Sequence, residues 1–200
     1  MGYERLGTGA TAVGIKVADG VVLAAEKRVS YGGYILSKAG KKVFKIKDRF
    51  GMACAGLFAD MQTLSRLISA EISYYEVSTG KPMSVKSAAR LLAVVLYSYK
   101  YFPFLSEILF GGIDEEGPHL FVMDPVGSLI EDDYAALGTG GAVAIGIIEG
   151  RYRSDLSLNE AEKLAVEAIK AAISRDAVSG DGIDTLVISK EGPAEKFYPV

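Results

Sequence analysis

Histidine and cysteine, the side chains that most often act as base or thiol nucleophile, each occur once in this 200-residue sequence. His119 lies between Pro118 and the apolar residues 120–122, far in sequence from any candidate nucleophile. A Ser-His-Asp or Cys-His arrangement is therefore hard to build. Cys54 lies in the apolar run 52–57, which is typical of a buried strand. One cysteine can form neither an internal disulfide nor a zinc site, so we expect structural roles for both residues, no metal and no cofactor.

Two other motifs could bind a ligand, but each fits a turn better. Gly138-Thr139-Gly140-Gly141 precedes a predicted helix, and helix N-termini bind anions. Its spacing matches neither the dinucleotide fingerprint nor the P-loop, and no lysine follows it, so we expect a tight turn into the helix. The acidic run Glu131-Asp132-Asp133 could bind a cation, although such runs are usually solvated turns.

Composition and charge exclude several classes of protein. Half of the residues are apolar, which is enough for one well-buried core and predicts a single domain. The net charge of −3 and the lack of a basic patch argue against a nucleic-acid partner. No apolar run reaches the roughly 18 residues of a membrane span, and the first residues lack the apolar region of a signal peptide. We therefore expect neither membrane insertion nor secretion.

The elements that must position any site begin with a block of strands. Residues 11–17 and 21–25 are apolar runs separated by Ala18-Asp19-Gly20, which predicts a β-hairpin. Residues 42–46 and 51–56 form a second pair of strand-like runs. The amino-terminal third is therefore predicted to be mostly strand.

From Asp60 the apolar period becomes helical. One face of the first predicted helix is formed by Met61, Leu64, Ile68, Ile72 and Tyr75. A second helix follows Pro82, with Ser84 as its N-cap. Its inner stripe is formed by Val85, Ala88, Leu92, Val95 and Tyr99.

The second half of the chain repeats this order of blocks. Strand patterns occur at 107–113, 119–123, 128–130 and 184–188, and a helix begins near Gly141. The last helix has the capping box Ser157 to Glu160 and an apolar face formed by Ala161, Leu164, Ala168, Ala172 and Ile173. Because strands and helices come in blocks rather than alternating, we expect an α+β fold of two antiparallel sheets with helices outside.

An ordered set of motifs resembles the β subunits of the proteasome, the archaeal type in particular. The motifs are GATAVGI at 9–15, DGVVLAAEKR at 19–28, KAGKK at 38–42, AGL at 55–57 with Asp60, FGGID at 110–114 and RDAVSG at 175–180. Each alone is weak, but the ordered set is specific and spans almost the whole chain. The resemblance implies the N-terminal nucleophile hydrolase fold, a four-layer αββα sandwich, in agreement with the predicted layers.

The chemistry of that family needs a threonine that this chain lacks. A precursor cleaves itself after a glycine, and the α-amine of the newly exposed threonine serves as base for its own hydroxyl. By resemblance, the cleavage site lies between Gly9 and Ala10, and Ala10 occupies the nucleophile position. Alanine has no hydroxyl, so we expect no peptidase activity and no self-cleavage. Residues 1–9 are then a retained leader, and residues 10–200 form the β-subunit domain.

The other catalytic residues of the family have counterparts here. Lys42 matches the lysine whose ammonium lowers the pKa of nearby groups, and Glu26 matches its carboxylate partner, often an aspartate. Gly56 matches the residue whose main-chain N–H faces the oxyanion. The network that orients the N-terminal residue and a water is implied to comprise Thr139, Asp176 and Ser179. Without the family, these would be a surface lysine, a strand end, and helix-end and turn residues.

The resemblance also implies a substrate site. Ser30 offers main-chain contacts that hold the substrate as an added strand. The side-chain pocket is implied to be lined by Val29, Gly40, Cys54 and Phe58. An uncharged lining favours apolar residues before the scissile bond, a chymotrypsin-like preference.

The implied partners are other β subunits in seven-membered rings, α-subunit rings, an ATP-dependent regulatory cap and unfolded polypeptides, in the cytoplasm. Two explanations of Ala10 remain: a replaced threonine that traps the precursor or abolishes activity, or a naturally silent subunit beside an active one. The retained polar groups favour a recent or deliberate change. The chain could instead serve as a purely structural ring subunit or as an amidohydrolase of small amides, against which the helices predicted over 60–101 argue. Rescue by Thr8 or Thr11 is a further hypothesis.

Overall fold

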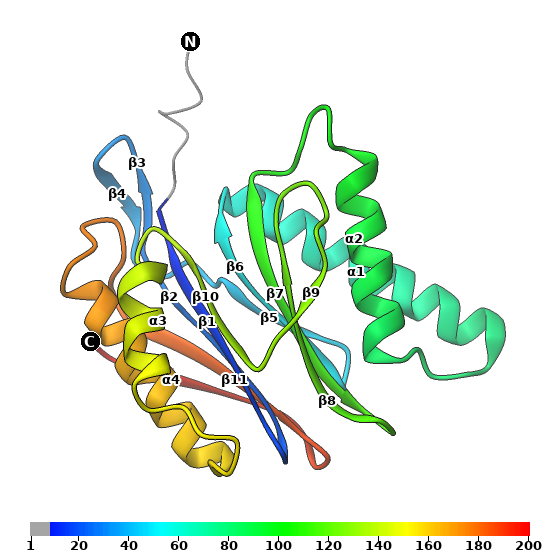
Figure 1. The fold of residues 1–200 in the computed structure, drawn as a ribbon. Coiled ribbons are helices and arrows are strands. Elements are labelled where there is room, and N and C mark those ends of the chain that lie inside the picture. Colours follow the sequence, from blue (N-terminus) through cyan, green and yellow to red (C-terminus); the bar gives the residue numbers. More distant parts are fainter. Residues whose placement is uncertain (1–8) are drawn as a thin grey trace.

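The computed structural model describes residues 9–200, which form two five-stranded antiparallel sheets between two pairs of helices (Figure 1). The first sheet has the order β10-β1-β2-β11-β12, with β1 (Thr11–Val17), β2 (Gly20–Glu26), β10 (Tyr134–Gly138), β11 (Ile183–Ser189) and β12 (Gly192–Tyr198). The second has the order β5-β6-β7-β8-β9, with β5 (Val43–Ile46), β6 (Phe50–Gly56), β7 (Ser106–Asp114), β8 (Gly117–Met123) and β9 (Ile130–Glu131). The predicted four-layer α+β sandwich is confirmed.

Four strands have no counterpart among the predicted elements. The short hairpin of β3 (Val29–Tyr31) and β4 (Tyr34–Ser37) is separate from both sheets, and most of its residues are exposed. β10 is half-buried along its whole length, and β12 is mostly exposed with charged residues at its centre. None of the four shows the alternating apolar and polar pattern from which strands are predicted.

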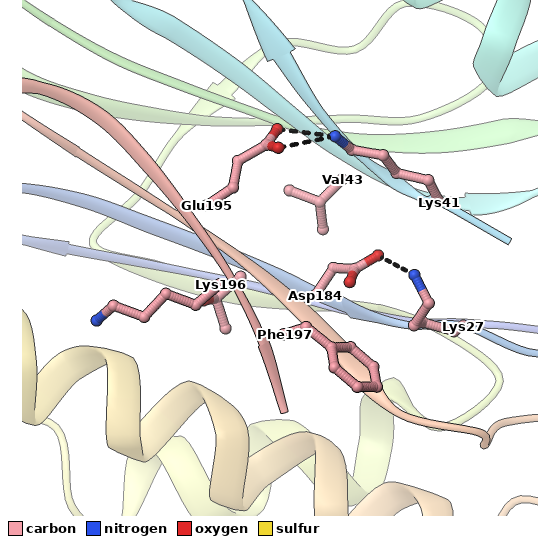
Figure 2. A pocket seen from close by; sticks show the side chains of 8 residues that line it. Lys27, Lys41, Val43, Asp184, Glu195, Lys196 and Phe197 are labelled. Atoms are coloured by element: carbon pink, nitrogen blue, oxygen red, sulfur yellow. Dashed lines mark hydrogen bonds and ion pairs between the residues drawn. The ribbon is translucent and has the colours of Figure 1, made fainter. Parts of the chain in front are cut away.

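The two sheets pack against each other through small and aliphatic side chains. Leu23, Leu109, Leu120 and Leu186 are buried in this interface among alanines and valines. The approach is close: a Cβ added to Gly51 would lie 2.4 Å from Leu186 Cδ2. At one open side of the sandwich, the Lys41–Glu195 ion pair joins the start of β5 to the middle of β12, and the Lys27–Asp184 pair joins the end of β2 to the start of β11 (Figure 2).

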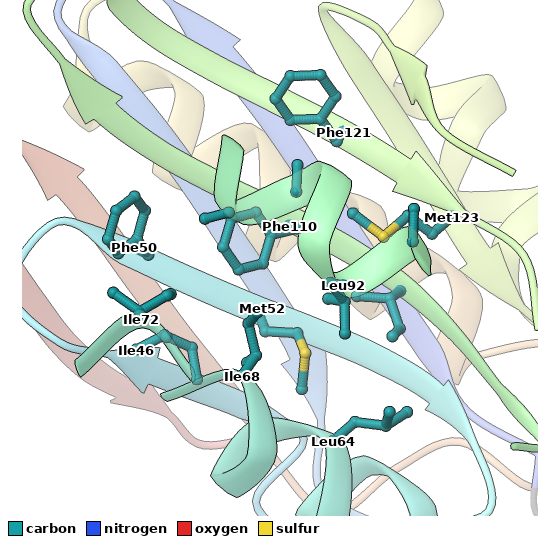
Figure 3. Packing of buried hydrophobic residues seen from close by; sticks show 14 of the residues in the cluster. Ile46, Phe50, Met52, Leu64, Ile68, Ile72, Leu92, Phe110, Phe121 and Met123 are labelled. Carbon is teal, nitrogen blue, oxygen red and sulfur yellow. The ribbon is translucent and has the colours of Figure 1, made fainter. Parts of the chain in front are cut away.

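Helices α1 (Phe58–Thr79) and α2 (Val85–Ser98) cover the outer face of the second sheet. They bury the predicted apolar faces against the sheet, including Leu64, Ile68 and Leu92 near Met52 and Phe110 (Figure 3). Ser84 is the N-cap as predicted, since its side chain accepts a hydrogen bond from Ser87 N.

Two tyrosines assigned to those apolar faces are exposed, and this part of the prediction is wrong. Tyr75 is 38% exposed because Ile72 is the last buried residue of α1, which continues to Thr79. Tyr99 is 50% exposed because α2 ends at Ser98.

The other helix pair, α3 (Gly141–Glu149) and α4 (Leu158–Ile173), covers the first sheet. The predicted capping box is present: Ser157 Oγ accepts from Glu160 N at 3.3 Å, and the Glu160 carboxylate accepts from Ser157 N at 2.9 Å. Within residues 9–200, no helix is both long and apolar enough to cross a membrane.

Candidate active site

Ala10 lies at the entry of the chain into the sandwich, directly before β1. Its side chain is buried, and the next residue, Thr11, pairs with Gly138 of β10. Gly138 has φ +84°, and a Cβ there would lie 2.1 Å from Ala10 O. A Cβ on Gly9 would lie 1.8 Å from Val178 Cγ2. Gly9, directly before Ala10, and Gly138, on the neighbouring strand β10, therefore leave no room for a Cβ.

A cleft of about 420 Å³ opens beside Ala10. Its other walls are Gly9, Ala55, Gly56, Leu105, Ser106, Glu107, Pro125, Gly138 and Thr139. Gly56 has φ +127°, and a Cβ there would lie 2.2 Å from Leu105 O, so this position also requires glycine. The structure thus brings Ala10, Gly56 and Thr139 to one cleft.

A buried ion pair lies behind this entry. Lys42 Nζ donates to a carboxylate oxygen of Glu26 and, at 2.5 Å, to the carbonyl oxygen of Arg28. The lysine is 3% exposed and the glutamate is fully buried, so the alternative of a surface lysine is wrong. Burial raises the pKa of Glu26 and lowers the pKa of Lys42, and the attraction between the two charges opposes both shifts.

Glu26 also holds the main chain around the site. Its Oε2 accepts from the N–H groups of Arg28 at 2.7 Å and Gly180 at 3.0 Å. Its Oε1 lies 3.4 Å from Thr11 N. One carboxylate therefore joins β1, the end of β2 and the loop after α4.

The predicted network of Thr139, Asp176 and Ser179 is assembled beside the hydroxyl of Thr11. Asp176 Oδ2 accepts hydrogen bonds from Thr139 Oγ1 at 2.5 Å and from Ser179 Oγ at 2.7 Å. Ser179 Oγ lies 2.8 Å from Thr11 Oγ1, and Thr139 Oγ1 lies 3.4 Å from Ala10 O. These residues come from three distant parts of the sequence, and they meet beside Ala10.

Arg28 is a further residue of the site, which the sequence pattern did not single out. Its Nε donates to Asp181 Oδ2 and its Nη1 to Ala177 O, both at 2.8 Å. The guanidinium lies so close to Gly180 that a Cβ there would be 2.3 Å from Arg28 Nη2. The hydrogen bond from Arg28 holds the pKa of Asp181 below its ordinary value. Arg28 therefore fixes the loop that carries Asp176 and Ser179.

Comparison with known proteins agrees with this geometry. The family model described as "Proteasome subunit" matches residues 6–188. "Proteasome subunit beta 1" of Hyperthermus butylicus is 62% identical over 192 residues, which cover 96% of this chain and 94% of the relative. The protein of the same name from Ignicoccus hospitalis is 60% identical over 182 residues, 91% of each chain. "Proteasome subunit beta 2" of Pyrobaculum calidifontis is 58% identical over 193 residues, 96% of this chain and 95% of the relative.

This chain belongs to the proteasome subunit family. The resemblance drawn from the ordered motifs is confirmed, and the similarity is to the β subunits of that family. Proteasome β subunits are peptidases by family, and proteasome subunits assemble with one another. The alternative of a small-amide hydrolase finds no support in these matches.

Only some of the residues predicted to form the proteasome-type substrate pocket lie next to one another in the structure. A Cβ on Gly40 would lie 2.3 Å from Val29 Cγ2 and 3.4 Å from Phe58 Cε2, so these three residues are neighbours. Cys54 is fully buried in the hydrophobic core between the second sheet and α1. Phe58, the first residue of α1, packs against this core. Burial raises the pKa of the Cys54 thiol, which makes it unreactive. None of the four lines the cleft at Ala10, and their role stays a prediction.

Ser30 and the two threonines near Ala10 have distinct settings. Ser30 is buried and pairs with Ile35 in the β3–β4 hairpin, and its substrate contacts also stay a prediction. Thr11 is fully buried with its hydroxyl beside Ser179, which leaves it little freedom to act as a nucleophile. Thr8 and the rest of the predicted leader up to residue 8 lie outside the described residues.

His119 and the glycine-rich motif at 138–141 have structural roles. His119 Nδ1 lies 2.6 Å from Glu131 Oε1, and its ring stacks on Phe121. Gly140 is the N-cap residue of α3, so the glycine-rich motif is a turn into a helix. In the part of the chain that the structure describes, no group of histidine, cysteine, aspartate or glutamate is arranged to hold a metal ion.

Proposed function

We propose that this chain is a β subunit of the proteasome core particle whose own active site is catalytically silent. One observation carries the proposal. The buried Lys42–Glu26 pair reaches the N–H of Thr11, and Thr139 of the Asp176 network reaches the carbonyl oxygen of Ala10. Residue 10, between them, is an alanine with neither hydroxyl nor thiol. The site has its supporting groups and no nucleophile.

The chemistry follows from what a threonine at position 10 would do. Its hydroxyl oxygen would attack the substrate carbonyl while its free α-amine takes the proton, and the amine product would leave with that proton. Water would then hydrolyse the ester. Lys42 supports the proton transfer by its charge, and Gly56, in the same cleft as Ala10, offers its main-chain N–H to the oxyanion. Without the hydroxyl no acyl-enzyme forms, and most of the rate enhancement is lost.

Self-cleavage needs the same hydroxyl, so residues 1–9 stay attached to this chain. Gly9 supports the position of the cleavage site, because its main chain is held between Val178 and Thr139 with no room for a side chain.

For an active variant we propose a chymotrypsin-like preference. The predicted pocket residues Val29, Gly40, Cys54 and Phe58 carry no charge, and a charged substrate side chain would find no partner among them.

The assembly we propose is the family's barrel, in which seven-membered β rings stack between α-subunit rings, receive unfolded polypeptides from an ATP-dependent cap and work in the cytoplasm. Exposed aromatic side chains support subunit contacts. Tyr74 of α1, Tyr97 of α2, and Tyr101 and Phe102 just after α2 are between 57% and 86% exposed. Such apolar surface is typical of an interaction site.

A second candidate is a purely structural subunit of a mixed ring. The relatives bear numbered names, beta 1 in two species and beta 2 in another, which favours particles with more than one kind of β chain. In such a ring this chain would supply walls while an active neighbour supplies catalysis.

Peptidase assays on assembled particles of the Ala10→Thr variant test the proposal. We expect the variant to hydrolyse fluorogenic peptides with an apolar residue before the scissile bond, and the unmodified chain to show none of this activity. Ala10→Val, which has a similar shape but no hydroxyl, is the matched control. An Ala10→Thr particle with no activity on any peptide would contradict the proposed site.

A further inference from the structure

The sheet edges of this chain gather on two opposite sides of the sandwich. β10 and β9 are edge strands of the two sheets, and β12 and β5 are the edges at the other ends. The Lys41–Glu195 ion pair and the proximity of β5 to β11 place the β5 and β12 edges together. In Figure 1, β9 and β10 lie at the front and β5 lies behind. Edge strands present unpaired backbone N–H and C=O groups, which can form hydrogen bonds with another chain.

One of these sides is hollowed. A cleft of about 270 Å³ is lined by Lys27, Lys41 and Phe197 together with Asp184 and Glu195, which pair with the two lysines (Figure 2). A larger cleft, about 500 Å³, lies between β5 and α1, and we name it the α1 groove. It is lined by Lys41, Phe44, Lys45, Ile46, Ser65, Arg66, Ser69, Ala70 and Ser73, with no acidic residue among them.

The cations of the α1 groove are incompletely neutralised by their own chain. Among the described residues, Lys45 pairs only with Asp48, which is 88% exposed. Within residues 9–200, Arg66 has no ion-pair partner, and its side chain is exposed. The groove therefore offers positive charge beside the apolar side chains of Phe44 and Ile46.

The opposite side is acidic. Glu131, Asp132 and Asp133 are exposed at the junction of β9 and β10, next to Ile130, which is 57% exposed. Glu131 contacts His119, and Asp133 pairs with Lys16. Asp132 accepts only the N–H of Asp133 at 2.7 Å and has no cation partner in the described chain. We name residues 130–133 the acidic edge.

We propose that the acidic edge of one copy of this chain docks in the α1 groove of the next copy, with Asp132 toward Arg66 and Lys45. Negative charge beside Ile130 complements positive charge beside Phe44 and Ile46, which favours specific association. The two surfaces are different and lie on opposite sides, so the contact is heterologous, and its repetition closes a ring when the rotation between copies divides a full turn, as the proposed seven-membered ring requires. All Ala10 sites then face the same way around the axis. The inference rests on the proposed function, because it specifies the neighbour within the β ring.

Charge reversal tests this contact in the full chain, alone and together with proteasome α-type subunits. Arg66→Glu and Asp132→Arg each place like charges together, and we expect each to weaken ring assembly about tenfold or more in subunit concentration. The double variant restores the opposite charges and is expected to assemble as the unmodified chain does. Analytical ultracentrifugation over a dilution series measures the assembly.

Two matched variants control for net charge. Lys190→Glu and Glu191→Arg change exposed residues in the turn between β11 and β12, which lines neither proposed surface, and should assemble normally. Melting temperatures verify that all variants fold.

The outcomes separate this inference from the proposed function. Rings that tolerate both single reversals would overturn the inference and leave the proposed ring intact. If each single reversal disrupts assembly and the double variant does not recover it, the proposal that a second copy of this chain occupies the α1 groove is overturned. A chain that stays monomeric even with α-type subunits would overturn the ring and the inference together, while peptidase activity of Ala10→Thr reports separately on the active site.

Discussion

The two polar clusters beside Ala10 are built on different physical principles. The Lys42–Glu26 pair is a buried charge pair, and each partner is stabilised in the interior by the other. The cluster around Asp176 consists of hydroxyl groups that share one carboxylate near the surface. Removing Lys42 or Glu26 leaves its partner as an uncompensated buried charge. Removing the hydroxyl of Thr139 or Ser179 takes away hydrogen bonds but no charged group. The comparison shows why the pair should be essential to the fold while the hydroxyl cluster is adjustable.

The largest effect is expected from breaking the buried pair. Lys42→Met should lower the free energy of unfolding by roughly 3–5 kcal/mol, because Glu26 then lies buried without its cation. Chemical denaturation measures the change. Lys41→Met is the matched control: its ion pair with Glu195 is about half exposed, so we expect a loss below about 1 kcal/mol. Equal losses in both variants would remove the distinction between buried and exposed pairs.

A smaller loss is expected within the hydroxyl cluster. Ser179→Ala removes the hydrogen bonds of a buried hydroxyl to Asp176 and Thr11, at a cost of about 2 kcal/mol in unfolding free energy. Ser179→Thr keeps the hydroxyl and should recover part of the loss. A cost as large as that of Lys42→Met, measured in the same denaturation series, would show that the two clusters do not differ as described.

The smallest effect is expected at Arg28, and it should depend on pH. The Arg28 guanidinium lowers the pKa of Asp181, so this contact stabilises the fold above the ordinary aspartate pKa of 3.8. That contribution is lost as the pH falls through the lower, folded-state pKa. Arg28→Met should cost about 1 kcal/mol at neutral pH and show a flatter decline of stability below pH 3.8. Parallel stability curves for the two proteins in acid would contradict this reason.

The fold was predictable where side chains repeat with a clear period. The hairpin of β1 and β2, the first face of α1 and the α4 capping box all follow from local pattern. β12 was not predictable, because it is an exposed edge strand with Glu195 and Lys196 at its centre. Such a strand lacks the alternation of apolar and polar residues that is typical of a half-buried strand.

The family register predicted which polar residues lie near Ala10, but not all of the contacts that hold them there. Lys42 alone resembles a surface lysine, and only the family register pairs it with Glu26, 16 residues away. Arg28 and Asp181 are 153 residues apart, and no local pattern predicts that one holds the loop of the other. Such contacts arise from the packing of β2 against the loop after α4, which the sequence does not display.

The central claim is that this site lacks one hydroxyl and is otherwise assembled. Intact-mass measurement of assembled particles tests it most directly. The unmodified chain should keep residues 1–9, and the Ala10→Thr chain should lose them and begin at residue 10. An Ala10→Thr particle that keeps its leader, or an unmodified chain that begins at Ala10 without any active subunit present, would contradict the claim.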